Sequence, residues 1–391
     1  MRHRAGLCAG EVPYWRLAGN YFFYFAYIGA FAPYFSLYLD SLGIAAGGIG
    51  IIMALPQAVR ILAPHLWGWL ADRSGRALGV ARGATAVGIL LYSGVFAAHS
   101  FLALFAVVLT MSFFLSAPLP LIEATTLSHL DEQTSRYGRI RVWGSIGFIA
   151  AVLLVGYALH EAPLSILLWI LLALLLGFMG LLAVIPSAPS KAQTHEPVPI
   201  GHILRRREVI VLMAACALMA VAHGPYYSFY SIDLVAHGYT TTQVGMLWAL
   251  GVICEIGIFF WMPQLFRAYT LRQVLLASFA LTALRFVMIA WGADSAVVLL
   301  AAQVLHAASF GSFHASALAL VNGYFSGRNQ SRGQALYTSL TFGLGGTVGG
   351  IYAGYAWEPL GAGLTFTGAA LCAACGWLIL RLTPQLRGIM R

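Results

Sequence analysis

Four ionisable side chains stand in the middle of long apolar stretches of this sequence, namely Arg60, Glu255, Arg285 and His306. Counted from the ends of those stretches at about 1.5 Å per residue, all four lie near the centre of a bilayer. A charge at that depth costs roughly 2.5–3.5 kcal/mol on insertion scales, so such a group normally faces a partner or a water-filled cavity. These positions are where we expect proton transfer or the binding of an ion.

Glu255 and Arg285 belong to consecutive antiparallel helices at matching depth, which predicts an ion pair that His306 can join. Histidine titrates near neutral pH, and a carboxyl group in an apolar cavity can titrate in the same range. The group is therefore a candidate for proton coupling, and we add His314, which lies nearer the cytoplasmic side. The alternative is a static ion pair that only fixes helix register.

Arg60 has no acidic neighbour on its own helix. Because a guanidinium can hold a carboxylate by two parallel hydrogen bonds, Arg60 is a candidate anchor for a substrate, unless it pairs structurally with Glu123 or Glu255. An arginine beside aromatic walls suits a small organic acid with an apolar body. The other candidates for substrate binding are Tyr24, Tyr27, Glu123, Arg141, Phe148, His223, Tyr226 and Tyr227.

The elements that carry these residues are membrane helices. Hydrophobic residues make up 60% of the 391 residues and charged residues 9%, which excludes a soluble globular domain. A helix needs about 20 apolar residues to cross a core of about 30 Å, and the alternation typical of outer-membrane strands is absent. The sequence predicts an all-α membrane protein with twelve spans, near 14–39, 47–70, 78–98, 101–128, 139–160, 163–186, 208–235, 242–266, 271–292, 295–324, 332–356 and 359–383.

The formal net charge of +9 is explained by topology rather than by a nucleic-acid partner. The basic residues fall almost entirely on alternate loops, and the opposite loops, near Asp40, His160 and Glu358, contain no lysine or arginine. By the positive-inside rule the basic side is cytoplasmic. We therefore expect a multi-pass protein of the cell inner (plasma) membrane with both termini in the cytoplasm.

The chain divides into two related halves at a long polar connection. The pattern around Pro33 returns around Pro225, and Gly50 in the second span matches Gly245 in the eighth. The predicted parts are a six-helix bundle over 1–186, a cytoplasmic linker over 187–207 and a second six-helix bundle over 208–391. Parallel repeats of this kind are typical of alternating-access carriers with a site between the halves, although aromatic-rich helices can also match by chance.

Residues 68–76 read GWLADRSGR, which resembles the loop motif of the major facilitator superfamily. The glycine permits close helix contact, the aspartate can accept hydrogen bonds from a neighbouring helix end, and the arginines hold the loop at the membrane surface. The motif predicts a conformational latch, and the alternative is a loop of compensating charges. Its residues are Gly68, Asp72, Arg73, Gly75 and Arg76.

Segments 20–25, 120–123 and 138–145 resemble the lactose permease group of proton symporters. The resemblance implies that Glu123 and Arg141 contact substrate. It also implies that Glu255, Arg285 and His306 form a buried coupling network. Two departures from that group make galactoside transport doubtful: Ser309 stands where an acidic residue is expected, and Phe148 replaces a tryptophan that stacks on the sugar.

The sequence also resembles the bacterial 3-phenylpropionic acid transporter family, through Arg60, residues 141–145, His223, Tyr226, Tyr227, Leu247, Trp248, Glu255, Arg285, His306 and His314. That resemblance implies proton-linked uptake of a small aromatic or other carboxylic acid. Sugars and nucleosides remain alternative substrates, and proton-driven efflux of drugs is the alternative direction of transport.

An enzyme is not expected, because the sequence has no zinc-binding histidine pair with an intervening glutamate, no nucleophile elbow and no P-loop. We therefore expect a secondary active transporter that uses the proton as coupling ion and needs no metal or other cofactor. Its expected partners are a small-molecule substrate and the lipid bilayer. One chain contains both halves, so we expect a functional monomer.

Overall fold

The computed structural model describes residues 12–131, 133–187 and 200–383, and these residues form helices and no strands. The first half contains α1 (Tyr14–Ser41), α2 (Ala46–Val59), α3 (Ala63–Ser74), α4 (Ala77–Tyr92), α5 (Phe101–Leu115), α6 (Pro118–Leu130), α7 (Tyr137–Glu161) and α8 (Ile166–Val184). The second half contains α9 (Gly201–Leu204), α10 (Arg207–Ala236), α11 (Thr241–Ala268), α12 (Leu271–Gly292), α13 (Ala296–Val304), α14 (Phe313–Tyr324), α15 (Gln330–Thr338) and α16 (Gly346–Arg381). Two π-helical turns, η3 (Ala307–Ser312) and η5 (Ser339–Gly345), and short 3₁₀ turns, η1 (Ser93–Ala97), η2 (Thr134–Arg136) and η4 (Gly327–Asn329), join them.

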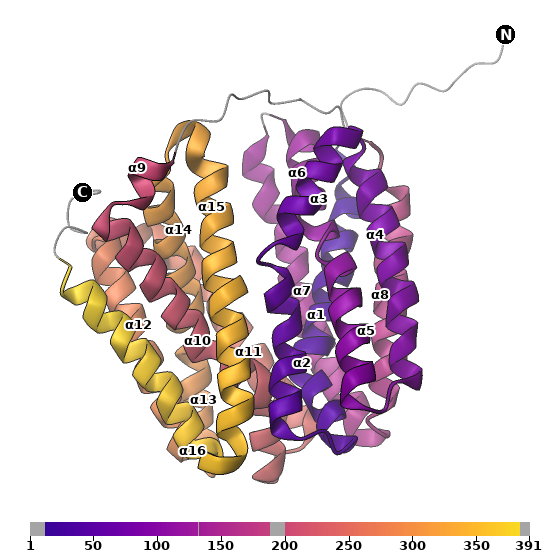
Figure 1. Ribbon diagram of the computed structural model, residues 1–391, viewed down its shortest axis with the longest axis vertical. Helices are drawn as coiled ribbons and strands as arrows, with labels where there is room; N and C mark the ends of the chain where they lie inside the picture. The colour runs from indigo at the N-terminus through magenta and orange to yellow at the C-terminus, as the bar shows by residue number, and fades with distance from the viewer. Residues whose placement is uncertain (1–11, 132, 188–199, 384–391) are drawn as a thin grey trace.

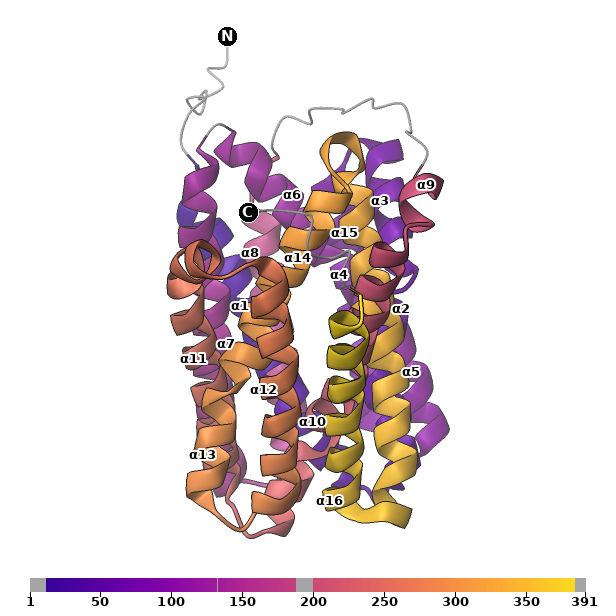
Figure 2. The ribbon, with the colours of Figure 1, turned by 90° about the vertical axis from the view of Figure 1, so that its left-hand side faces the viewer.

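The described residues contain eleven helical stretches that are long and apolar enough to cross a membrane. The last of them, Gln330–Arg381, has 52 residues, more than twice the length that one crossing needs. It turns at Gly361, where φ is 75° and the backbone is not helical, so it contributes two antiparallel spans. Figure 2 shows the two limbs of α16 side by side, joined at the end opposite α9. The prediction of an all-α protein with twelve spans is therefore confirmed.

Prolines divide two of the spans. Pro64 has no N–H to donate to the carbonyl of Arg60, four residues earlier, and α2 ends where that hydrogen bond would form. In the same way Pro120 cannot donate to Ser116, which lies at the break between α5 and α6. The first of these breaks bends the second span at Arg60.

Figure 1 shows α1 to α8, in indigo to magenta, on one side of the molecule and α10 to α16 on the other. The two groups contact each other through α1 with α10, α2 with α16 and α7 with α11. Of the predicted linker 187–207, residues 188–199 lie outside the described residues, and the rest includes the short helix α9. The predicted boundaries at 186 and 208 stay a prediction.

The halves are in close contact at one end, which we call the closed end. The backbone amide of Ala46 donates to Oε1 of Glu358 over 2.9 Å, from one half to the other. A Cβ on Gly50 would lie 2.5 Å from the carbonyl oxygen of Gly350, and one on Gly245 would lie 2.4 Å from that of Val152. Small residues allow helices to pack this closely in a membrane.

We expect Gly50→Leu to disfavour the conformation in which the closed end is sealed, because the new side chain meets backbone atoms of α16. Forcing methylene groups into a tight contact costs about 1–3 kcal/mol. The distance between spin labels at Asp40 and Asp294, exposed residues of the two halves near this end, should increase. In the control, Gly83→Leu, where no heavy atom lies within 4 Å of a new Cβ, that distance should not change. An unchanged distance in Gly50→Leu would contradict this role of the glycine contact.

Candidate functional site

The centre of the second half holds a pair of titratable groups. Nε2 of His306, which lies directly before the π-helical turn η3, is 3.8 Å from Oε2 of Glu255 on α11. Both side chains are largely buried, with 7% and 18% of their surfaces exposed. The predicted association of His306 with Glu255 is therefore present in the structure, and their role in proton coupling stays a prediction.

Arg285, on α12, departs from the predicted ion pair with Glu255. Its side chain is completely buried, and within the described residues it has no carboxylate within ion-pair distance. Instead Nε donates to the carbonyl oxygen of Ala302 over 3.1 Å, and Nη1 donates to Oγ of Ser309 over 3.3 Å. The guanidinium also lies 4.2 Å from the ring centre of Tyr226. Matching depth on two helices did not fix the direction of the side chain, so this predicted pair is wrong in the conformation described.

The π-helical turn η3 aligns three rings on one side of the tenth span. Phe310 stacks between His306 and His314, with interplanar angles of 11° and 12°. Nδ1 of His314 is 3.2 Å from the hydroxyl of Tyr337 on α15. His314 is therefore in contact with a tyrosine and a phenylalanine, and not with Glu255. π-helical turns occur frequently at functional sites.

A second ion pair lies in the first half. Nε of Arg141 on α7 is 3.9 Å from Oε1 of Glu123 on α6, and the side chains are 32% and 36% exposed. The guanidinium lies 4.0 Å from the ring centre of Phe25, and Tyr137 donates to Glu123 over 3.5 Å. Arg141 also interacts electrostatically with Glu255 across the boundary between the halves. The structure thus brings the predicted pair together.

Arg60 lies at the break between α2 and α3 and lines a cavity with about 610 Å³ of empty space. Tyr24 and Tyr27 line the same cavity, and Tyr24 interacts electrostatically with Arg60. Within the described residues no carboxylate lies at ion-pair distance from Arg60. The predicted structural pairing with Glu123 or Glu255 is therefore absent. Arg60 is a partly buried cation that lines the cavity together with the two tyrosines.

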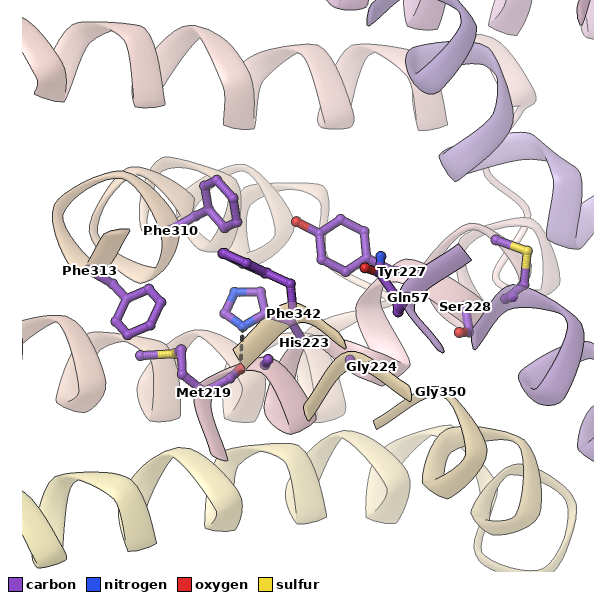
Figure 3. A pocket seen from close by; sticks show the side chains of 13 residues that line it. Gln57, Met219, His223, Gly224, Tyr227, Ser228, Phe310, Phe313, Phe342 and Gly350 are labelled. Atoms are coloured by element: carbon purple, nitrogen blue, oxygen red, sulfur yellow. Dashed lines mark hydrogen bonds between the residues drawn. The ribbon is translucent and has the colours of Figure 1, made fainter. Parts of the chain in front are cut away.

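A second cavity, with about 540 Å³ of empty space, lies between α2, α10, η3 and η5 (Figure 3). His223 and Tyr227 line it, as predicted for substrate contact, whereas Tyr226 faces the interior of the second half. Phe148 does not line either cavity. Its backbone and ring contact α1 at Gly29, where a Cβ would lie 2.7 Å from the Phe148 carbonyl oxygen.

Sequence reasoning missed several polar and aromatic residues at this site. Gln57 lines the second cavity, together with Phe310 and Phe342. Gln303 is completely buried, donates to the Tyr230 hydroxyl over 2.6 Å and accepts from the Tyr226 hydroxyl over 3.2 Å. A glutamine inside an apolar run was the available signal in both helices.

The predicted latch lies at the end of α3. Gly75 adopts φ of 62° and ends the helix, and Arg73 lies 5.4 Å from the ring centre of Trp69. A Cβ on Gly68 would meet no heavy atom within 4 Å, so the predicted close helix contact at Gly68 is absent in this conformation. The backbone carbonyl of Asp72 accepts from the Gly75 amide over 3.3 Å, but its carboxylate forms no ion pair or hydrogen bond with any described residue. The latch stays a prediction for a conformation in which the two halves close at the end of the molecule that carries the α3–α4 loop.

No group of three or more histidine, cysteine, aspartate or glutamate side chains within the described ranges is arranged to hold a metal ion. The candidate site thus consists of two cavities, of Arg60 without an acidic partner among the described residues, and of the pairs Glu123–Arg141 and Glu255–His306.

Comparisons with known proteins agree with this architecture. The chain is 29% identical over 378 residues to a probable 3-phenylpropionic acid transporter of Escherichia coli (strain K12), covering 94% of this chain and 98% of that protein. It is 28% identical to a maltose permease of Geobacillus stearothermophilus, covering 93% of each. A crystal structure of the nucleoside transporter NupG superposes with a TM-score of 0.83 at 19% identity, covering 95% of this chain and 98% of that one, which shows a shared fold.

A family model described as the MFS_1 like family matches residues 14–368. This match covers eleven of the predicted spans and part of the twelfth, and the relatives are transporters of the same superfamily. The chain is a multi-pass membrane transporter that belongs to the MFS_1-like family of the major facilitator superfamily.

Proposed function

We propose that this protein is a proton-coupled symporter that imports a small carboxylic acid, most favourably one with an aromatic body such as 3-phenylpropionate. The observation that carries the proposal is Arg60, a cation inside a membrane span that faces a tyrosine-lined cavity and has no acidic partner among the described residues. A carboxylate in this cavity would supply the missing charge through two parallel hydrogen bonds.

The balance of charges in the core supports an anionic substrate. Three arginines, Arg60, Arg141 and Arg285, share this region with two carboxyl groups, Glu123 and Glu255. Intramembrane charges are normally compensated because an isolated charge is costly in hydrocarbon. One cation remains when both carboxyl groups are ionised, and two remain when Glu255 is protonated, so an anionic substrate would offset the positive excess in either state.

Proton coupling is assigned to Glu255 with His306 as its neighbour, because this pair is buried beside Arg285 and connects electrostatically to Arg141. In the proposed cycle Glu255 is protonated when substrate binds and releases its proton on the side where substrate leaves. His314, on α14, stacks on Phe310 beside His306, and Arg285, on α12, donates to Ser309 in η3. The cotransported proton would make the import of a monovalent acid electrically neutral.

We assign the closed end to the outside of the cell inner membrane and the termini to the cytoplasm, because the basic loops predict that topology. The sealed contact between Gly50 and Gly350, together with an Asp72 carboxylate that has no partner among the described residues, then corresponds to a conformation that faces the cytoplasm. Each chain contributes both cavities, which supports a functional monomer.

A neutral polar solute is the second candidate. The half-exposed Glu123 and Arg141 can hydrogen-bond hydroxyl groups, and relatives include a maltose permease and nucleoside permeases. Proton-driven efflux remains the alternative direction, since the same pairs would serve an antiporter.

Counterflow separates these substrates without a proton gradient. Proteoliposomes loaded with unlabelled 3-phenylpropionate, maltose or uridine would be diluted into the same labelled compound, with protein-free liposomes as control. We expect transient accumulation of the labelled acid only. Counterflow of maltose or uridine without counterflow of the acid would overturn the proposed substrate class.

A further inference from the structure

The cavity beside η3 contains a histidine nitrogen that has no partner. Nδ1 of His223 on α10 lies 2.8 Å from the carbonyl oxygen of Met219. A carbonyl oxygen only accepts, so Nδ1 carries the proton, and in the neutral ring Nε2 is an acceptor. His223 is 4% exposed, and Nε2 is buried without a hydrogen bond. Figure 3 shows this nitrogen turned away from Met219, among the rings of Phe310, Phe313 and Phe342.

Gln57 on α2 supplies a second polar atom without a partner. Its Oε1 is buried and has no hydrogen bond, and the side chain lines the same cavity (Figure 3). A buried acceptor that is left unpaired costs about 1–3 kcal/mol. Two such atoms, contributed by opposite halves, face a space of about 540 Å³ that is otherwise mainly apolar and aromatic. That volume lies within the range of about 300–1,000 Å³ found for small-molecule sites.

This cavity borders the proposed carboxylate anchor. Gln57 and Arg60 are separated by about one helical turn on the second span. Tyr227, which lines the cavity of His223, interacts electrostatically with Arg60. A small acid that spans the two adjacent cavities would reach Arg60 with its carboxylate while its ring lies beside Phe310 and Phe342.

We infer that the preferred substrate is an aromatic acid whose ring carries a hydrogen-bond donor, in particular a phenolic hydroxyl that donates to Nε2 of His223. This inference rests on the proposed function and narrows its substrate class. The apolar rings accept the aryl body, and the hydroxyl satisfies an acceptor that an unsubstituted phenyl ring leaves unpaired. Because one hydroxyl has one proton, Oε1 of Gln57, from the other half, would accept from a second donor on the ring.

A nucleobase also presents N–H donors on an aromatic ring and would satisfy His223 equally well. We favour the hydroxylated acid because a neutral nucleoside leaves Arg60 without a counter-charge. The two sources of the donor are separated by the experiment.

The test compares 3-(4-hydroxyphenyl)propionate with 3-phenylpropionate in counterflow, as the ratio of their kcat/KM values. Sites built to bond a substrate hydroxyl discriminate strongly against analogues that lack it, and we expect the ratio to be about tenfold or more in the natural protein. In His223→Phe, which keeps a ring and removes the acceptor, the ratio should fall to about one. In His223→Gln, whose amide can place an oxygen near the position of Nε2, part of the preference should return.

The control is His160→Phe at an exposed position, which should leave the ratio unchanged. A ratio is independent of the amount of folded protein, so poor expression of a variant does not imitate the expected result. Uptake of both acids with no preference would overturn this inference and leave the proposed function standing. Counterflow of neither acid, with uridine counterflow that His223→Phe abolishes, would overturn both.

Discussion

Replacing Arg60 with alanine is expected to reduce kcat/KM for uptake of 3-phenylpropionate by roughly a hundredfold, because truncating one partner of a buried charge pair costs about 2–5 kcal/mol. Arg60 is the one arginine of the core that has no acid, carbonyl or ring partner recorded among the described residues, so its charge is free for a substrate. Arg60→Lys keeps the charge and loses the two-pronged geometry, and it should recover only part of the activity.

The matched control is Arg267→Ala, which removes one exposed arginine from the end of α11. It should leave the uptake rate close to that of the natural protein. Equal losses in Arg60→Ala and Arg267→Ala would show that net charge, and not a substrate contact, sets the rate. Full activity in Arg60→Ala would remove Arg60 from the binding site.

The second large effect is expected in Glu255→Gln. The amide keeps the size and hydrogen-bonding capacity of the side chain but cannot release a proton, so accumulation driven by a proton gradient should fall to the level reached without a gradient. Counterflow, which requires no net proton movement, should persist. Accumulation and counterflow would be measured on the same proteoliposomes.

Glu161→Gln, at the exposed end of α7, is the matched control and should accumulate substrate normally. If Glu255→Gln still accumulates the acid against its gradient, another group carries the proton. If it loses counterflow as well, Glu255 holds the substrate or the fold and the assignment to coupling is wrong.

Much of the fold follows from the sequence because spans in a bilayer are set by length and polarity. The span predicted near 332–356 corresponds to α15, η5 and the first limb of α16, and the span near 359–383 corresponds to the limb after Gly361, although these residues form one helical stretch. The break at Arg60 could also have been foreseen, because Pro64 stands four residues later and the rule applies locally.

The contacts of individual side chains were harder to predict from the sequence than the spans. The depth of Glu255 and Arg285 was inferred from counting residues, but depth leaves the rotation of each helix open. Arg285 instead donates to the carbonyl of Ala302, near the end of α13, and to Ser309 in the π-helical turn η3. Phe148 likewise turns toward α1, because the close approach at Gly29 decides which face of α7 is covered.

Contacts between the halves were the least predictable. The interaction of Arg141 with Glu255 and the shared cavity of Gln57 and His223 depend on how the two bundles are placed in one conformation. The sequence around one residue of each pair does not predict the other residue. The two lie far apart in the chain, and their contact changes as the bundles move.

The most direct test of the account is accumulation of radiolabelled 3-phenylpropionate in proteoliposomes, with and without an inward proton gradient. Protein-free liposomes must be subtracted, because a weak acid also crosses lipid in its neutral form. The account predicts protein-dependent accumulation above the external concentration only with the gradient, and its loss in Arg60→Ala. Protein-dependent depletion of the acid under the same gradient, or uptake that ignores the gradient, would contradict proton-coupled import.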